Sequence, residues 1–205
     1  MKNPGIIVRK YVNDITKEIF RKSIHICTAL VPFALSIAKI PVLIALAAVL
    51  IFYTISEFLR LKGKPIPFIS AVTQAASRRR DENHFVLGPV TLALGVLITG
   101  AIFPLEIACV GIYALAFGDG LASLVGKLFG SIIIPFTKGK TVAGSLACFV
   151  AIFISSFLCT KNSLFALIIA LVGMFIEVMP IKDFDNLLIP ILLSFLLQLL
   201  YYFHK

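Results

Sequence analysis

Long apolar runs, separated by short polar or turn-forming stretches, dominate the order of residues along this chain. Each run approaches the roughly 20 residues that an α-helix needs to cross the hydrocarbon core of a bilayer. Backbone groups in lipid must form their hydrogen bonds within the segment, so these runs are predicted to be helices. Seven spans are predicted, at residues 24–38, 41–59, 84–103, 105–125, 142–160, 163–179 and 187–203.

The residues before the first span have a different pattern. Tyr11, Ile15 and Ile19 recur every four positions, with basic residues between them. This spacing predicts an amphipathic helix over residues 4–20 that lies on the inner leaflet. The fold class expected is therefore all-α: one membrane domain of residues 1–205, with an amphipathic segment at 1–22 and a polytopic helix bundle at 24–203.

Composition excludes a soluble domain. The 205 residues are 60% hydrophobic and only 14% charged, with a mean hydropathy of +1.03, whereas soluble domains carry roughly 25% charged residues. If the N-terminus is cytoplasmic, all of the 19 lysines and arginines except Lys39, Lys161 and Lys205 lie on the inner side. This follows the positive-inside rule. The charge of +9 is thus explained by topology and membrane lipids, without nucleic acid. A multi-pass protein in the plasma membrane of a prokaryote is expected, with its active site facing the cytoplasm.

The acidic residues gather on the same side, since only Glu106 of the ten falls on the outer side. Ionisable residues within or at the ends of spans are costly and tend to mark functional sites. Acids beside lysines suit a polyphosphate bound with Mg²⁺, which prefers carboxylate and phosphate oxygens. The inner acids are Glu57, Asp119, Glu177, Asp183 and Asp185, and the nearby lysines are Lys127, Lys138 and Lys140.

Two stretches carry most of this chemistry. On a helix, Asp119, Ser123 and Gly126 share one face, and glycines there allow a phosphate or another helix to approach closely. Helix packing explains these glycines equally well, but it gives no reason for an acid at 119. The second stretch, at residues 138–145, leads Lys140 into the start of the fifth span, where free backbone amides favour anions. The alternative is an ordinary basic loop with a Thr/Ser cap. A P-loop is excluded because it requires glycine where Ile134 stands.

Two further positions have both a structural and a functional interpretation. Asp185 and Asn186 precede the seventh span, where they could cap the helix and also bind a metal. His25 shares a helix face with Arg21 and Lys22 at the membrane edge. A hydrogen-bonding role at the interface is the simpler interpretation of His25.

These motifs, in this order, resemble the polyprenol kinase family, which includes dolichol kinase, phytol kinase and CTP-dependent diacylglycerol kinase. The matching residues are Arg21-Lys22-x-x-His25, the stretch from Asp119 to Gly130, Lys140-Thr141-x-x-Gly144-Ser145 and Asp185-Asn186-x-x-Ile189-Pro190. The family is distantly similar to phosphatidate cytidylyltransferases, but residues 182–186 lack the His-Gly-Gly part of their signature. The resemblance implies a membrane lipid kinase that transfers a phosphoryl group from CTP to a lipid alcohol such as a polyprenol, phytol or diacylglycerol.

The alternatives are a phosphatidate cytidylyltransferase and a non-enzymatic transporter. A transporter would be expected to show repeats and midplane charges. For the kinase, each candidate residue has an expected role. Asp119, Lys140 and Glu177 are catalytic candidates. Nucleotide binding is assigned to Gly120, Ser123, Gly126, Lys127, Lys138, Thr141, Gly144 and Ser145, with amides of the fifth helix start contributing. A divalent cation, Mg²⁺ above all, is expected to bind Asp119, Asp183, Asp185 and Asn186. The residues expected to contact the lipid are His25, Glu57 and Glu82.

Overall fold

The computed structural model describes residues 4–77, 84–137 and 139–204, and these residues are almost entirely helical. Within them the only β-type pairing is an isolated bridge between Ile133 and Thr141. The all-α prediction is therefore confirmed. The helices are α1 (Pro4–Cys27), α2 (Val31–Leu61), α3 (Pro67–Ala76), α4 (Gly88–Ile102), α5 (Leu105–Tyr113), α6 (Gly120–Phe129), α7 (Val142–Thr160), α8 (Ser163–Val178) and α9 (Asp185–Phe203), with 3₁₀ turns at Thr28–Leu30 and Lys182–Phe184 and a π-helical segment at Ala114–Asp119.

Four helical stretches of the described chain are long and apolar enough to cross a membrane. They are Asp14–Leu61, Leu105–Phe129, Val142–Thr160 and Lys182–Phe203, and two shorter apolar helices, Gly88–Ile102 and Ser163–Val178, accompany them. The predicted third span starts too early, because α4 begins only at the Gly88-Pro89 pair. The polytopic bundle is thus confirmed, with two of its predicted spans shorter than a typical crossing helix.

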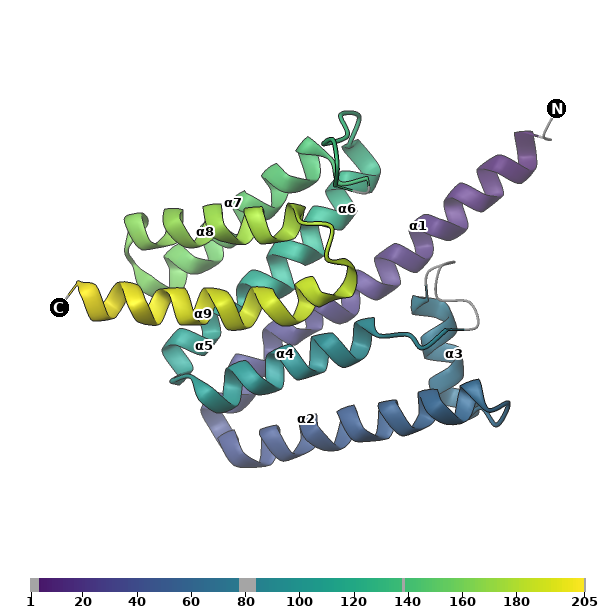
Figure 1. Cartoon of the computed structure of the whole chain (residues 1–205), viewed down its shortest axis with the longest axis horizontal. Coiled ribbons are helices and arrows are strands. Elements are labelled where there is room, and N and C mark those ends of the chain that lie inside the picture. Colours follow the sequence, from purple (N-terminus) through teal and green to yellow (C-terminus); the bar gives the residue numbers. More distant parts are fainter. Residues whose placement is uncertain (1–3, 78–83, 138, 205) are drawn as a thin grey trace.

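The first long stretch bends back on itself. Ala38 has non-helical backbone angles (φ −148°, ψ 78°), which divide the stretch where the first two spans were predicted to meet. Figure 1 shows α1 and α2 running in roughly opposite directions from this turn. No break separates the predicted amphipathic segment from the first span, since α1 continues unbroken to Cys27. Its second half also turns polar residues inward, because Glu18, Lys22 and His25 are buried.

The stretch from α5 through the π-helical segment to α6 forms the centre of the bundle. Val110, Ile112, Ala114 and Leu115 are completely buried there. In contrast, α2 exposes large apolar residues such as Ile37, Ile44 and Phe52, as expected for a lipid-facing helix.

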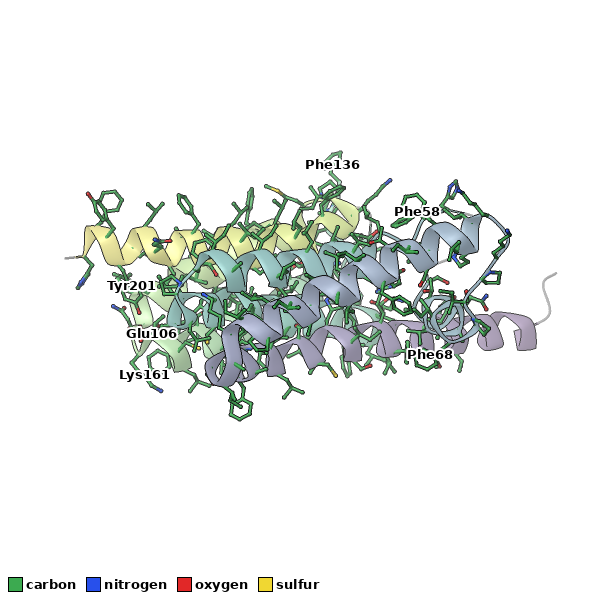
Figure 2. The ribbon with its side chains drawn as sticks, turned by 90° about the horizontal axis from the view of Figure 1, so that it is seen from below. Phe58, Phe68, Glu106, Phe136, Lys161 and Tyr201 are labelled. Atoms are coloured by element: carbon green, nitrogen blue, oxygen red, sulfur yellow. The ribbon has the colours of Figure 1, made fainter. Side chains whose placement is uncertain are left out.

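Residues that the charge pattern predicts on opposite sides of the membrane lie toward opposite ends of the bundle. Figure 2 shows Glu106, Lys161 and Tyr201 together at one end, and Phe58, Phe68 and Phe136 away from them toward the other. The loops after α2 and α6 therefore lie in the same half of the molecule, and the end of α8 joins them, because Glu177 is paired with Lys140. The candidate site is in this half.

Candidate active site

Four polar residues on one face of α1 begin the site. Glu18, Arg21, Lys22 and His25 are spaced three or four positions apart and therefore share a helix face. Lys22 is only 2% exposed, and its ammonium group donates to Asp119. His25 Nδ1 lies 3.0 Å from the same oxygen, Asp119 Oδ2. The buried carboxylate of Asp119 is thus bound by Lys22 of the first helix, with the His25 ring beside it.

Asp119 owes its position to an irregular helix. The segment Ala114–Asp119 is π-helical, so it contains a wider turn than the α-helices on either side. Such turns change the direction in which the following side chains point, and they occur frequently at functional sites. Asp119 is the last residue of this segment, directly before α6 begins.

A second cluster surrounds Lys140. Its ammonium group donates to Glu177 Oε1 and lies 3.9 Å from Asp185 Oδ2. Burial alone would lower the pKa of Lys140, but the nearby carboxylates of Glu177 and Asp119 outweigh it, so the pKa is raised above its ordinary value. Lys140 is therefore a permanent positive charge at neutral pH.

The start of α7 supplies fewer free amides than the sequence suggests. Val142 N donates to Ile132 O at 3.0 Å and Ser145 N to Thr141 O at 3.0 Å. Gly144 N donates to the capping hydroxyl of Thr141 at 3.2 Å. These three amides therefore already have partners in this structure, and phosphate binding by the amides of this segment stays a prediction. The side-chain hydroxyl of Ser145 is instead buried and has no partner among the described residues.

Helices α6 and α7 approach each other closely at their glycines. A Cβ atom on Gly144 would lie 2.7 Å from Ala122 O and 3.2 Å from Gly126 Cα. Any side chain at position 144 would therefore push the two helices apart. The glycines at 126 and 144 serve helix packing, whatever else they do.

Two adjoining cavities contain most of the predicted site residues. The first, called the polar cavity here, has a volume of about 400 Å³ and lies between α1, α6, α7 and the loop after α8. The predicted residues that line it are Ser123, Gly126, Lys127, Lys140, Thr141, Gly144, Ser145, Glu177 and Asp185.

The second, called the apolar cavity here, has a volume of about 180 Å³ and is enclosed by α1, α2, α3, α4 and the start of α9. His25, Asp119, Asp183 and Asn186 line this cavity. Arg21 and Asp185 line both cavities, which are therefore neighbours. Asp119 faces the apolar cavity, and not the polar one where a role in triphosphate binding would place it.

Several predicted residues lie elsewhere. Glu57 lines neither cavity. Its carboxylate instead accepts hydrogen bonds from Arg60 and, at 2.8 Å, from the backbone N of Val86. Gly120 also lines neither cavity, and a Cβ atom there would contact Ile26 at 3.3 Å. Lys138 and Glu82 lie outside the described residues.

The sequence interpretation missed Glu18, and it gave Arg21 and Lys22 no role in the site beyond their place in the motif with His25. Glu18 accepts from Arg21 and lies 2.6 Å from Lys127 Nζ, which links α1 to α6. The signal was present, since charges three or four apart interrupt an otherwise apolar helix face. The basic residues before Glu18 were interpreted as the polar side of a helix on the inner leaflet, and Glu18 was not set apart from them.

The predicted metal ligands do not form a single cluster. Within residues 4–77, 84–137 and 139–204, no group of three His, Cys, Asp or Glu side chains is placed to hold an ion. Magnesium in nucleotide sites, however, usually needs only one or two protein carboxylates together with phosphate oxygens. Glu177 Oε2 is buried and has no hydrogen-bond partner among the described residues, and Asp185 lies close by across Lys140. This pair of acids fits such a metal.

The fold and the cavities define a multi-pass membrane protein with a lysine-lined cavity at one end of its helices. Comparison with known proteins narrows this class. The chain is 33% identical over 140 residues to "Probable phytol kinase 3, chloroplastic" of Glycine max, covering 59% of this chain and 43% of that protein. It is 32% identical over 139 residues to "CTP-dependent diacylglycerol kinase 1" of Schizosaccharomyces pombe, covering 60% and 64%.

A third relative, "Probable phytol kinase, chloroplastic" of Triticum aestivum, is 29% identical over 148 residues, covering 62% of this chain and 49% of that protein. The chain spans about half the length of the curated relatives it matches. No family model matches the chain, and no solved structure does. The resemblance to the polyprenol kinase family is confirmed by these relatives.

Proposed function

We propose that this protein is a membrane lipid kinase that transfers the terminal phosphoryl group of a nucleoside triphosphate, CTP by analogy with its relatives, to a lipid alcohol. The observation that carries the proposal is the polar cavity. It combines Lys127 and Lys140 with two buried polar atoms, Ser145 Oγ and Glu177 Oε2, that have no partner among the described residues. Buried polar atoms are nearly always paired, so these two point to a bound ligand.

The triphosphate would be bound mainly by charge. Lys127, in the last turn of α6, and Lys140, shortly before α7, both line the polar cavity, and each can neutralise phosphate oxygens. The Ser145 hydroxyl would add a hydrogen bond. The site end of the bundle would face the cytoplasm, where nucleoside triphosphates are available.

Glu177 and Asp185 would hold a divalent cation together with the phosphates. When bound, such a cation would neutralise charge on the β- and γ-phosphates. The chain's own part is to position the reactants: Lys140 keeps the two acids in place before the nucleotide arrives.

In the transfer step, the oxygen of the lipid hydroxyl forms a bond to the γ-phosphorus. The bond from that phosphorus to the β,γ-bridging oxygen breaks, the nucleoside diphosphate leaves, and the hydroxyl proton is released to solvent. Because the transition state is loose, positioning and charge neutralisation supply most of the rate enhancement.

The experiment uses purified protein in lipid nanodiscs with Mg²⁺, mixed lipid alcohols and CTP labelled at either the α- or the γ-phosphate. We expect γ-label in the lipid, lost about 100-fold or more in Lys140→Met and retained in Lys39→Met, which changes an exposed lysine. Transfer of α-label would instead show a cytidylyltransferase. Transfer of neither label would favour a transporter.

A further inference from the structure

The apolar cavity has no assigned role in nucleotide binding, although it borders the polar cavity. Arg21 and Asp185 form part of the wall of both. Asp119, on the apolar side, is also close enough to Lys140 for an electrostatic interaction. A second ligand in the apolar cavity would therefore lie next to the end of a nucleotide in the polar cavity.

The chemistry of the two cavities differs. Apolar side chains, among them Ile24, Val72, Val86 and Leu92, line much of the apolar cavity. Two of its charges, Lys22 and Asp119, are buried and paired with each other. Arg21 is paired with Glu18, and the remaining charges that line the cavity, Asp183 and Asp185, are negative. A neutral molecule with an apolar chain suits this cavity better than an anion.

One atom in the apolar cavity indicates a polar ligand group. Thr73, on α3, is only 3% exposed, and its Oγ1 has no hydrogen-bond partner among the described residues. It lines the cavity. A buried hydroxyl without a partner is costly, so a ligand that hydrogen-bonds to Thr73 would remove this cost.

We infer that the apolar cavity binds the hydroxyl end of the lipid alcohol, with Thr73 contacting its polar group and α3 determining which acceptor fits. The inference rests on the proposed function and assigns the acceptor subsite within it. Pockets for drug-sized ligands are typically about 300–1,000 Å³. At about 180 Å³, the cavity takes only the head of the lipid, and the remaining chain extends into hydrocarbon.

Helix α3 is suited to this role because small residues form its inner face. Ser70, Thr73 and Ala76 are buried at a spacing of three, while Phe68 is 79% exposed on the other side. Enlarging Ala76 would fill the cavity without touching the polar cavity, whose lining includes no residue of α3. Gln74 offers a matched control, since it is exposed on the same helix.

The experiment compares Ala76→Phe, Thr73→Val and Gln74→Phe in nanodiscs, with a prenol and a diacylglycerol as separate acceptors. We expect Ala76→Phe to lower kcat/KM for the acceptor at least tenfold and Thr73→Val to lower it about tenfold, with the Kd for CTP within twofold of wild type. Gln74→Phe should change neither. If Thr73→Val lowers kcat/KM more for diacylglycerol than for the prenol, the ester groups of diacylglycerol, and not only its hydroxyl, contact Thr73.

An unchanged kcat/KM for the acceptor in both Ala76→Phe and Thr73→Val would overturn the assignment. So would a rise in the Kd for CTP as large as the fall in kcat/KM for the acceptor. If Ala76→Phe does not fold, the isosteric Thr73→Val variant decides. A diazirine-bearing long-chain alcohol gives a readout independent of activity: its cross-links should map to α3 or to the second half of α1. Cross-links there without any transfer from CTP would refute the proposed function alone, and cross-links elsewhere would refute the acceptor site alone.

Discussion

At the scale of single residues, the buried pair between Lys22 and Asp119 is one of the contacts that attach α1 to the centre of the bundle. Both side chains are at most 3% exposed. Removing one partner from a buried pair leaves the other charge uncompensated, at a cost of about 3–5 kcal/mol. We expect Lys22→Met to lower the melting temperature in detergent by on the order of 10 °C.

The double variant Lys22→Met/Asp119→Asn removes both charges and should recover most of that stability. Turnover of the double variant and of Asp119→Asn then tests separately the catalytic role predicted for Asp119 from the sequence, with loss of activity in a stable protein as the expected result. Lys39→Met, which changes an exposed lysine, controls for the loss of a positive charge. A Lys22→Met protein as stable as wild type would show that the pair contributes nothing to folding.

Residue types in the sequence indicated which acids matter, but not which groups face them. Asp119 stood out because a carboxylate in an apolar run is costly. Its partner Lys22 lies 97 positions earlier and could not be chosen from the other lysines by spacing, since spacing reports only neighbours on one helix. The same limit explains why the sequence alone did not place Asp119, predicted to be catalytic and to hold the cation, beside the apolar cavity.

At the scale of elements, the close approach of α6 and α7 shapes the polar cavity. A methyl group on Gly144 would meet the backbone oxygen of Ala122, which cannot move without shifting α6. We expect Gly144→Ala to cost about 1–3 kcal/mol through overpacking and to reduce activity about tenfold by separating Lys127 from Lys140. Turnover and melting temperature are the measurements.

Val142→Ile is the matched control for Gly144→Ala, because it enlarges an exposed side chain on the same helix. It should leave both quantities near wild type. If Gly144→Ala keeps full activity, the distance between α6 and α7 does not limit nucleotide binding, and the glycine serves packing elsewhere in the interface.

Helix boundaries were predictable where apolar runs end at turn-forming residues. The fifth span was predicted at 142–160, and α7 covers Val142–Thr160, since Thr141 caps one end and Lys161 adopts a left-handed conformation at the other. The π-helical segment was not predictable, because Ala114–Asp119 continues the apolar pattern of its neighbours. Its extra width depends on packing against other helices, which hydropathy does not describe.

At the scale of the whole molecule, the proposed function requires the site end of the bundle to face the nucleotide. Lys64 lies in the turn after α2, and Lys161 ends α7; both are exposed. The charge pattern places them on opposite sides of the membrane, with Lys64 inside. Figure 2 shows Lys161 at one end of the bundle and Phe58, which precedes Lys64 near the end of α2, toward the other.

Single cysteines at these positions test this orientation. In a background whose four native cysteines are replaced, a membrane-impermeant maleimide should label Lys161→Cys in intact cells and Lys64→Cys only after the membrane is opened. The reverse pattern would place Lys127 and Lys140 on the outer side, where no cytoplasmic triphosphate could reach them. Labelling of both from outside would show that the chain crosses the membrane differently, and the polar cavity would then need another anion as its ligand.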